Sequence, residues 1–143
     1  MLKKKVIQRV VVGGLIFKGG KLLLLQRSDD EDVFPSQWEI PSGKKDNLEI
    51  VTDCLVREMW EETGLRVKPL QHIQAFNYQI EKENEIRDNT KINYTVEVIG
   101  SYKITLSKEH QKFSWVDPDD VNGYEMTNLM KEIVMGSFTS NFK

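Results

Sequence analysis

The sequence predicts an α/β (α+β) protein in which helices cover both faces of a β-sheet. Runs rich in β-branched and large apolar residues alternate along the chain with segments of helical periodicity. Residues 22–25 are four consecutive leucines, which is typical of a strand buried on both faces. Residues 48–63 and 128–135 have apolar stripes at helical spacing, so they are expected to supply covering helices.

Composition excludes several classes of protein. The 143 residues are enough for one domain with its own core, and we treat residues 1–143 as a single domain. The net charge of −2 provides no basic field for nucleic acid, and no apolar run approaches the roughly 18 residues of a membrane span. Cys54 is the single cysteine, which excludes an internal disulfide and fits a cytoplasmic protein.

The N-terminal third is predicted to form a hairpin, a loop and a short strand. Gln8 and Arg9 interrupt the first apolar run, so we interpret it as a strand and not as a signal peptide. These elements are a strand over residues 6–17, a turn at residues 18–20, a strand over residues 21–27, an exposed loop over residues 28–36 and a short strand over residues 37–41.

The helix over residues 48–63 has one apolar face and one acidic face. Asp46 or Asn47 is expected to be its N-cap, and Gly64 supplies the left-handed residue that often follows a helix. Cys54 is interpreted as a packing residue, because no neighbouring basic side chain would lower the pKa of its thiol.

The acidic face carries Glu58, Glu61 and Glu62, which lie within about 100° of arc at 3.6 residues per turn. Like charges at this spacing repel by about 0.2–0.5 kcal/mol per pair, and acids near a helix C-terminus oppose its dipole. A hard divalent cation would compensate, because carboxylate oxygens suit Mg²⁺. Arg57 lies one turn before Glu61 and is placed to tether one carboxylate while the others bind metal.

The C-terminal half is predicted to contain more strands and a last helix. Eight of the ten residues 81–90 are charged or carry an amide, so they are expected to form a solvated hairpin loop. His110 is expected to be a surface residue. The full order is a strand over residues 65–80 kinked at Pro69, the loop over residues 81–90, a strand over residues 91–106, a strand within residues 107–116, a helix start at Asp117 and Pro118, a helix over residues 128–135 and a frayed tail over residues 137–143.

Residues 43–65 resemble the Nudix box, which is a glycine, five residues, a glutamate, seven residues and then Arg-Glu-apolar-x-Glu-Glu-x-Gly-apolar. The matching positions are Gly43, Glu49, Arg57, Glu58, Met59, Glu61, Glu62, Gly64 and Leu65. With seven fixed identities at about 7% each, a chance match has odds of about one in 10⁸. The chain is therefore identified as a member of the Nudix hydrolase family. The resemblance implies the Nudix fold, an α/β/α sandwich with a mixed β-sheet between helices.

The same resemblance implies roles for individual residues. It assigns metal binding to Glu58, Glu61, Glu62 and the carbonyl of Gly43, and catalytic roles to Arg57, Glu58, Glu61 and Glu109. Either Glu58 or Glu109 would be the general base. Arg27 resembles the arginine that many nucleotide-hydrolysing members place against substrate phosphate, and Glu49 would support the geometry of the loop and helix. Ser42 departs from the family pattern, which often has two glycines here.

The implied reaction is Mg²⁺-dependent hydrolysis of a diphosphate linked to another group, and Mn²⁺ would also suit the site. Arg27 and Glu109 resemble the mutator-type branch, which favours a nucleoside triphosphate pyrophosphohydrolase acting on normal or oxidised triphosphates. An ADP-ribose or nucleotide-sugar pyrophosphatase of the same family is the alternative. A regulatory module that binds nucleotide without turnover is the alternative from another class, and the intact glutamate set disfavours it. Phe34, Trp38 or Tyr78 would either stack on a base or pack in the core. A homodimer is compatible with the sequence.

Overall fold

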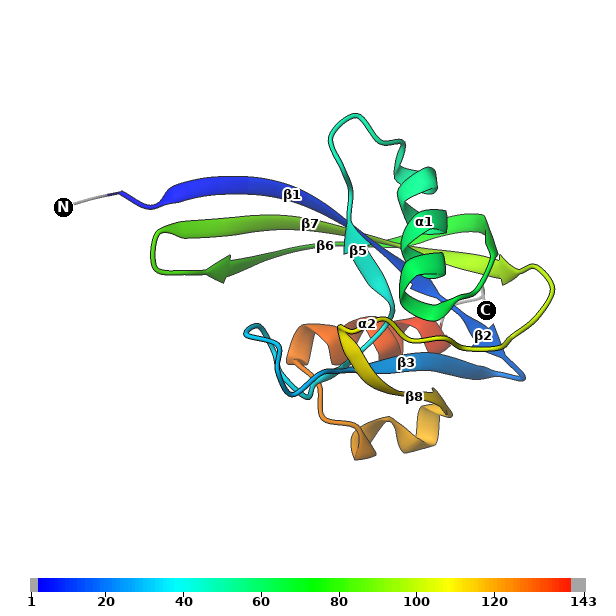
Figure 1. The fold of residues 1–143 in the computed structure, drawn as a ribbon. Coiled ribbons are helices and arrows are strands. Elements are labelled where there is room, and N and C mark those ends of the chain that lie inside the picture. The colour runs from blue at the N-terminus through cyan, green and yellow to red at the C-terminus, as the bar shows by residue number, and fades with distance from the viewer. Residues whose placement is uncertain (1–2, 140–143) are drawn as a thin grey trace.

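The computed structural model describes residues 3–139, which form strands and helices arranged in layers (Figure 1). The elements are β1 (Lys5–Leu15), β2 (Phe17–Lys18), β3 (Lys21–Arg27), β4 (Trp38–Glu39), β5 (Ser42–Lys44), α1 (Val51–Thr63), β6 (Val67–Glu81), β7 (Glu85–Val98), β8 (His110–Val116), the 3-10 helix η1 (Pro118–Gly123) and α2 (Asn128–Thr139). The predicted mixture of helices and strands is therefore confirmed.

The strands form two sheets. The first has the order β5-β1-β7-β6 and is mixed, because β1 runs parallel to β7 and antiparallel to β5. The second is antiparallel, with β2, β3 and β4 in order and β8 paired to β3. The strand predicted over residues 6–17 is divided between the sheets at Ile16, whose carbonyl accepts a hydrogen bond from the Leu23 amide at 2.9 Å. The predicted hairpin is thus made by β2 and β3.

β3 lies between two apolar cores and contributes side chains to both. All four leucines of residues 22–25 are fully buried, as the sequence predicts. Leu22 and Leu24 pack in the core that contains the apolar side chains of α2, whereas Leu23 and Leu25 pack in the core that contains those of α1. The two helices therefore cover opposite faces, which confirms the α/β/α layers. Cys54 is buried in the α1 core and is a packing residue, as expected.

The start of α1 differs from the prediction. The helix begins at Val51 after an N-cap at Ile50 that has no side-chain capping bond, so the proposed caps Asp46 and Asn47 are wrong. Leu48 has a positive φ of 65°, which takes the preceding backbone out of the helix. The predicted end is correct, because Gly64 follows α1 with a left-handed φ of 73°.

The loop predicted over residues 81–90 is wrong, because β6 reaches Glu81 and β7 begins at Glu85. The polar side chains of this segment belong to a long hairpin that extends beyond the helices together with the start of β1 (Figure 1). A polar strand is stable there because β7 pairs along both of its edges, with β1 and β6. The predicted kink is confirmed by a register shift between Pro69 and Gln71.

Several boundaries near the C-terminus also shift. The strand predicted over residues 91–106 ends at Val98, and the next strand begins at His110. Asp117 and Pro118 start η1, as predicted, although the Asp117 side chain makes no capping bond. The last helix continues to Thr139, so the tail predicted over residues 137–143 is wrong for its first three residues, and residues 140–143 lie outside the described part of the chain.

Candidate active site

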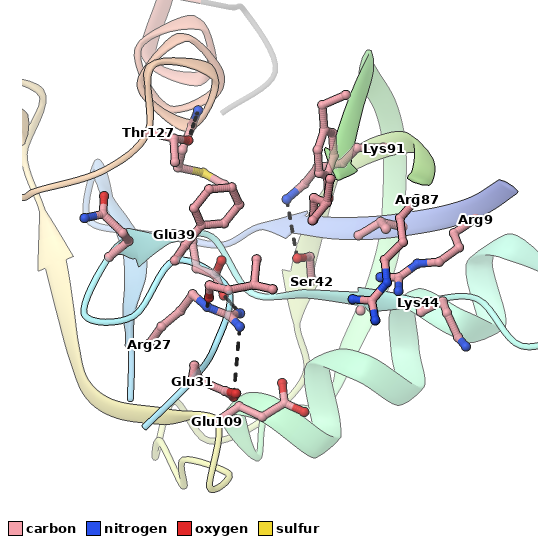
Figure 2. A pocket seen from close by; sticks show the side chains of 18 of the residues that line it. Arg9, Arg27, Glu31, Glu39, Ser42, Lys44, Arg87, Lys91, Glu109 and Thr127 are labelled. Carbon is pink, nitrogen blue, oxygen red and sulfur yellow. Dashed lines mark hydrogen bonds and ion pairs between the residues drawn. The ribbon is translucent and has the colours of Figure 1, made fainter. Parts of the chain in front are cut away.

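One cavity of about 690 Å³ gathers most of the residues that the sequence singles out. Its lining residues include Arg27, Phe34, Trp38, Glu39, Ser42, Gly43, Lys44, Glu58, Glu62, Tyr78 and Glu109. They come from both sheets, from α1, from the loop between β3 and β4 and from the segment before β8. In Figure 2, dashed lines join Lys91 of β7 to Ser42 of β5, and Arg27 of β3 to Glu31.

Two carboxylates of α1 border this cavity, Glu58 and Glu62, one turn apart. Glu62 is 4% exposed and accepts a hydrogen bond from the Ser42 amide at 2.9 Å. Burial, and then the charges of Glu39 and other carboxylates, raise the pKa of Glu62 well above its ordinary value. Burial also raises the pKa of Glu58, against the opposing effect of Arg57. The protein therefore holds these two carboxylates together at an electrostatic cost.

Arg57 connects the loop, the helix and the acidic cluster. Its guanidinium donates to Glu58 at 2.7 Å, to Glu61 at 3.2 Å and to Glu49 at 2.8 and 2.9 Å. It also donates to the Lys44 carbonyl at 3.2 Å. The predicted tether of Glu61 by Arg57 is present, and the Glu61 side chain is 53% exposed and lies outside the cavity lining. Glu49, whose pKa Arg57 lowers to about 2, supports the loop as expected.

Gly43 is needed for space at its α-carbon. It lies in β5, outside the left-handed region that glycines such as Gly64 adopt. A Cβ added to Gly43 would overlap the carboxylate of Glu58. The glycine therefore lets the carboxylate lie directly against the β5 backbone, and this role differs from the backbone freedom usually assigned to glycine.

The donor set fits a hard divalent cation whose remaining coordination positions are filled by other ligands. Within residues 3–139, no group of three or more His, Cys, Asp or Glu side chains is placed to hold a metal ion. Glu62 nevertheless supplies a buried carboxylate and Glu58 a half-buried one, at a site where a Cβ on Gly43 would fill the space beside Glu58. Mg²⁺ usually takes one or two protein carboxylates and fills its remaining positions with water and substrate phosphates.

Arg27 belongs to a partly buried network that the sequence did not reveal. It donates to the Val33 carbonyl at 2.8 Å and to Glu39 at 3.3 Å. His110 lies 2.9 Å from the same Glu39 oxygen through Nε2, and its side chain is 0% exposed. The expectation that His110 is a surface residue is therefore wrong. Burial alone would raise the pKa of Glu39, but His110 and Arg27 lower it below its ordinary value.

The pairing of strands explains why this network was missed. His110 lies opposite Arg27 at a register shift between β3 and β8, which no local pattern in the sequence reveals. Lys91 of β7 was missed for the same reason. It is 4% exposed and donates to the Ser42 hydroxyl at 3.4 Å. Burial lowers the pKa of the Lys91 ammonium.

The lining of the cavity contains aromatic and cationic side chains. Phe34, Trp38 and Tyr78 are the residues that the sequence offered for base stacking, and all three line the cavity. Arg9, Lys44 and Arg87 line it as well, and the guanidinium groups of Arg9 and Arg87 lie together in the view of Figure 2. The cavity thus offers surfaces for both an aromatic base and an anionic group.

The sequence matches the NUDIX domain family over residues 7–136. The chain belongs to the NUDIX family. The predicted enzyme class, a Nudix pyrophosphohydrolase, is confirmed by this match. Nudix hydrolases generally use divalent metal ions, in agreement with the donor set formed by Glu58 and Glu62.

Individual Nudix proteins resemble this chain over most of its length. The nucleoside triphosphatase NudI of Escherichia fergusonii is 33% identical over 130 residues, which cover 83% of this chain and 89% of the relative. The MutT protein from Methanosarcina mazei Go1 superposes with a TM-score of 0.77 at 27% identity, covering 96% of each chain. The mutator MutT protein from Bacillus halodurans superposes with a TM-score of 0.72 at 26% identity, covering 93% of this chain and 84% of that protein.

These structural neighbours confirm that this chain has the Nudix fold predicted from residues 43–65. Among the described residues, no helix combines the length and the apolar character that crossing a membrane requires.

Proposed function

We propose that this Nudix hydrolase cleaves nucleoside triphosphates with Mg²⁺, releasing a nucleoside monophosphate and pyrophosphate. The observation that carries the proposal is one cavity that joins Glu58 and Glu62 to aromatic and cationic side chains. A nucleotide has an aromatic base and a polyphosphate, so it matches both kinds of surface. The similarity to nucleoside triphosphatase NudI supports a triphosphate. Oxidised guanine triphosphates are included in the proposal because Arg27 and Glu109 resemble the mutator-type branch.

Each residue of the site has a role in this proposal. Glu58 and Glu62 would hold the cation with the Gly43 carbonyl, and Glu61 would belong to the same cluster through Arg57. When bound, Mg²⁺, or Mn²⁺ in its place, neutralises phosphate charge and lowers the pKa of the attacking water.

The remaining roles concern the proton and the phosphates. Either Glu58 or Glu109 accepts the proton of the water, since both carboxylates line the cavity. Arg27 is held at the cavity wall by Glu39 and by the Val33 carbonyl, and its guanidinium is proposed to face substrate phosphate.

Product analysis tests the reaction. The purified chain is incubated with Mg²⁺ and normal or oxidised nucleoside triphosphates, ADP-ribose, nucleotide sugars or dinucleoside polyphosphates, and all phosphate products are quantified. Equal amounts of monophosphate and pyrophosphate from triphosphates support the proposal. Exclusive cleavage of ADP-ribose or of a nucleotide sugar would place the chain in another branch of the family, and tight binding without turnover would indicate a regulatory module.

A matched pair of variants tests the site. Glu58→Gln is expected to lower turnover by at least about 10³-fold with little effect on folding, because it removes a contact used in the transition state. Glu132→Gln removes one carboxylate from the exposed surface of α2 and is expected to retain full activity. Near-normal turnover by Glu58→Gln would refute the assignment of the site.

A further inference from the structure

Two buried polar groups without hydrogen-bond partners lie side by side in the first sheet. The Nε of Arg9 on β1 has no partner, and neither the oxygen nor the nitrogen of the Asn89 amide on β7 has one. Arg9 and Asn89 are directly opposite each other in the parallel pairing of β1 with β7. Leaving such groups unpaired costs about 1–3 kcal/mol each, so a pair of them at one place requires an explanation.

Asn89 is surrounded by residues that line the cavity. It is 0% exposed, and its neighbours two residues away on β7 are Arg87 and Lys91. Tyr78 is its partner on β6, opposite Arg9 on the other side. These four neighbours all line the cavity, so Asn89 lies in the wall immediately behind it.

The positive charge at this place exceeds the negative charge paired with it. Arg9 lies opposite Asn89, two residues from Arg87, and the two guanidinium groups lie together in the view of Figure 2, whereas Lys44 points away from them. Arg87 donates through Nε to Glu85 at 2.9 Å. Among residues 3–139, no ion pair within 4.0 Å involves Arg9 or Lys44. Converging cations repel one another, and a multiply charged anion would relieve that repulsion through charge-assisted hydrogen bonds.

We infer that Arg9, Arg87 and Asn89 form a subsite for the terminal phosphates of the substrate, which retains them as pyrophosphate after cleavage. The inference rests on the proposed function, and it adds the direction in which the nucleotide lies. The polyphosphate extends from the carboxylates of α1 toward the shared end of β1 and β7. The base then lies toward the aromatic side chains Phe34 and Trp38.

The choice of pyrophosphate follows from the chemistry of the groups. Two guanidinium groups match the several acceptor oxygens of two linked phosphates, and the buried Asn89 amide lies directly behind them. A nucleobase presents few acceptors and no charge, so it would leave Arg9 and Arg87 uncompensated.

Direct binding of inorganic pyrophosphate tests the subsite without requiring turnover. Calorimetric titration with Mg²⁺ present is carried out on the unaltered chain and on Arg9→Gln, Arg87→Gln and Lys68→Gln. Lys68 is exposed on β6 and lies outside the cavity lining, so its variant controls for the loss of one positive charge. Each arginine variant is expected to raise the Kd of pyrophosphate at least about tenfold, since hydrogen bonds to charged groups contribute that much or more. Lys68→Gln is expected to stay within about twofold.

A second ligand separates this subsite from the rest of the cavity. Adenosine monophosphate lacks the terminal phosphates, so its Kd is expected to change less than about twofold in the arginine variants. Equal weakening of both ligands, an unchanged pyrophosphate Kd in both arginine variants, or no binding of pyrophosphate to the unaltered chain would each overturn the inference. Specific pyrophosphate binding without triphosphate hydrolysis would leave the subsite standing while the proposed function fails.

Asn89→Leu tests the amide separately. The subsite predicts weaker pyrophosphate binding and a higher melting temperature, because an unpaired buried amide is replaced by an apolar side chain of similar size. A lower melting temperature together with unchanged pyrophosphate binding would show that Asn89 serves the fold alone and would remove it from the subsite.

Discussion

Gly43→Ala is predicted to damage catalysis while leaving the fold intact. The added Cβ would overlap the Glu58 carboxylate, which must retreat by about 1 Å or more to reach ordinary van der Waals contact. A displacement of this size in a reacting group lowers rates by about 10²-fold. The backbone does not oppose the change, because Gly43 is outside the left-handed region. The free energy of unfolding is therefore expected to change by less than about 2 kcal/mol, chiefly through the 2.7 Å hydrogen bond from Arg57 to Glu58.

The assay for this variant is steady-state release of pyrophosphate from a triphosphate, paired with urea unfolding. Gly123→Ala is the matched control, because no atom lies within 4 Å of its added Cβ and its φ is not left-handed. We expect kcat of Gly123→Ala to equal that of the unaltered chain and kcat of Gly43→Ala to fall by about 10²-fold. Equal kcat values for the two variants would refute the steric argument.

Three further predictions concern stability and reactivity. Arg57 lowers the pKa of Glu49 to about 2 from an ordinary 4.5. The stabilising contribution of the Glu49 carboxylate is therefore complete above pH 4.5 and is lost as the pH falls toward 2. Unfolding followed by circular dichroism should show that Glu49→Gln loses less stability than the unaltered chain across this pH range. Burial raises the pKa of the Cys54 thiol to about 12, so a thiol reagent should label it only after unfolding, and rapid labelling of the folded chain would contradict its burial. Leu24→Ala should lower the free energy of unfolding by about 2–5 kcal/mol in urea titrations, whereas Leu70→Ala, which is 56% exposed, should change it by less than about 0.5 kcal/mol.

The sequence was most informative where function demands fixed spacing within one element. The contact of Arg57 with Glu61 follows from helical periodicity, and the supporting role of Glu49 follows from the motif of residues 43–65. The contact of Arg57 with the adjacent Glu58 was not predicted. The burial of residues 22–25 was equally predictable, because a run of four leucines leaves no polar face for solvent.

The sequence was least informative where strands from distant parts of the chain meet. Arg9 and Asn89 are 80 positions apart and face each other only because β1 pairs in parallel with β7. The polar composition of residues 81–90 favoured a loop, and that prediction concealed Arg87 and Asn89, which line or adjoin the cavity. A polar composition indicates only that a segment can be exposed to solvent. Whether that segment forms a strand depends on the backbone hydrogen bonds that neighbouring strands offer it.

The alternation of the β3 leucines between two cores has a consequence for cooperativity. Loss of α1 would uncover Leu23 and Leu25, and loss of α2 would uncover Leu22 and Leu24, so neither helix can separate without weakening the same strand. The two halves are therefore expected to melt as one unit, with the slowest amide hydrogen exchange in β3. The positions of the α1 carboxylates therefore depend on the packing of the whole molecule, including that of α2 on the opposite face of β3.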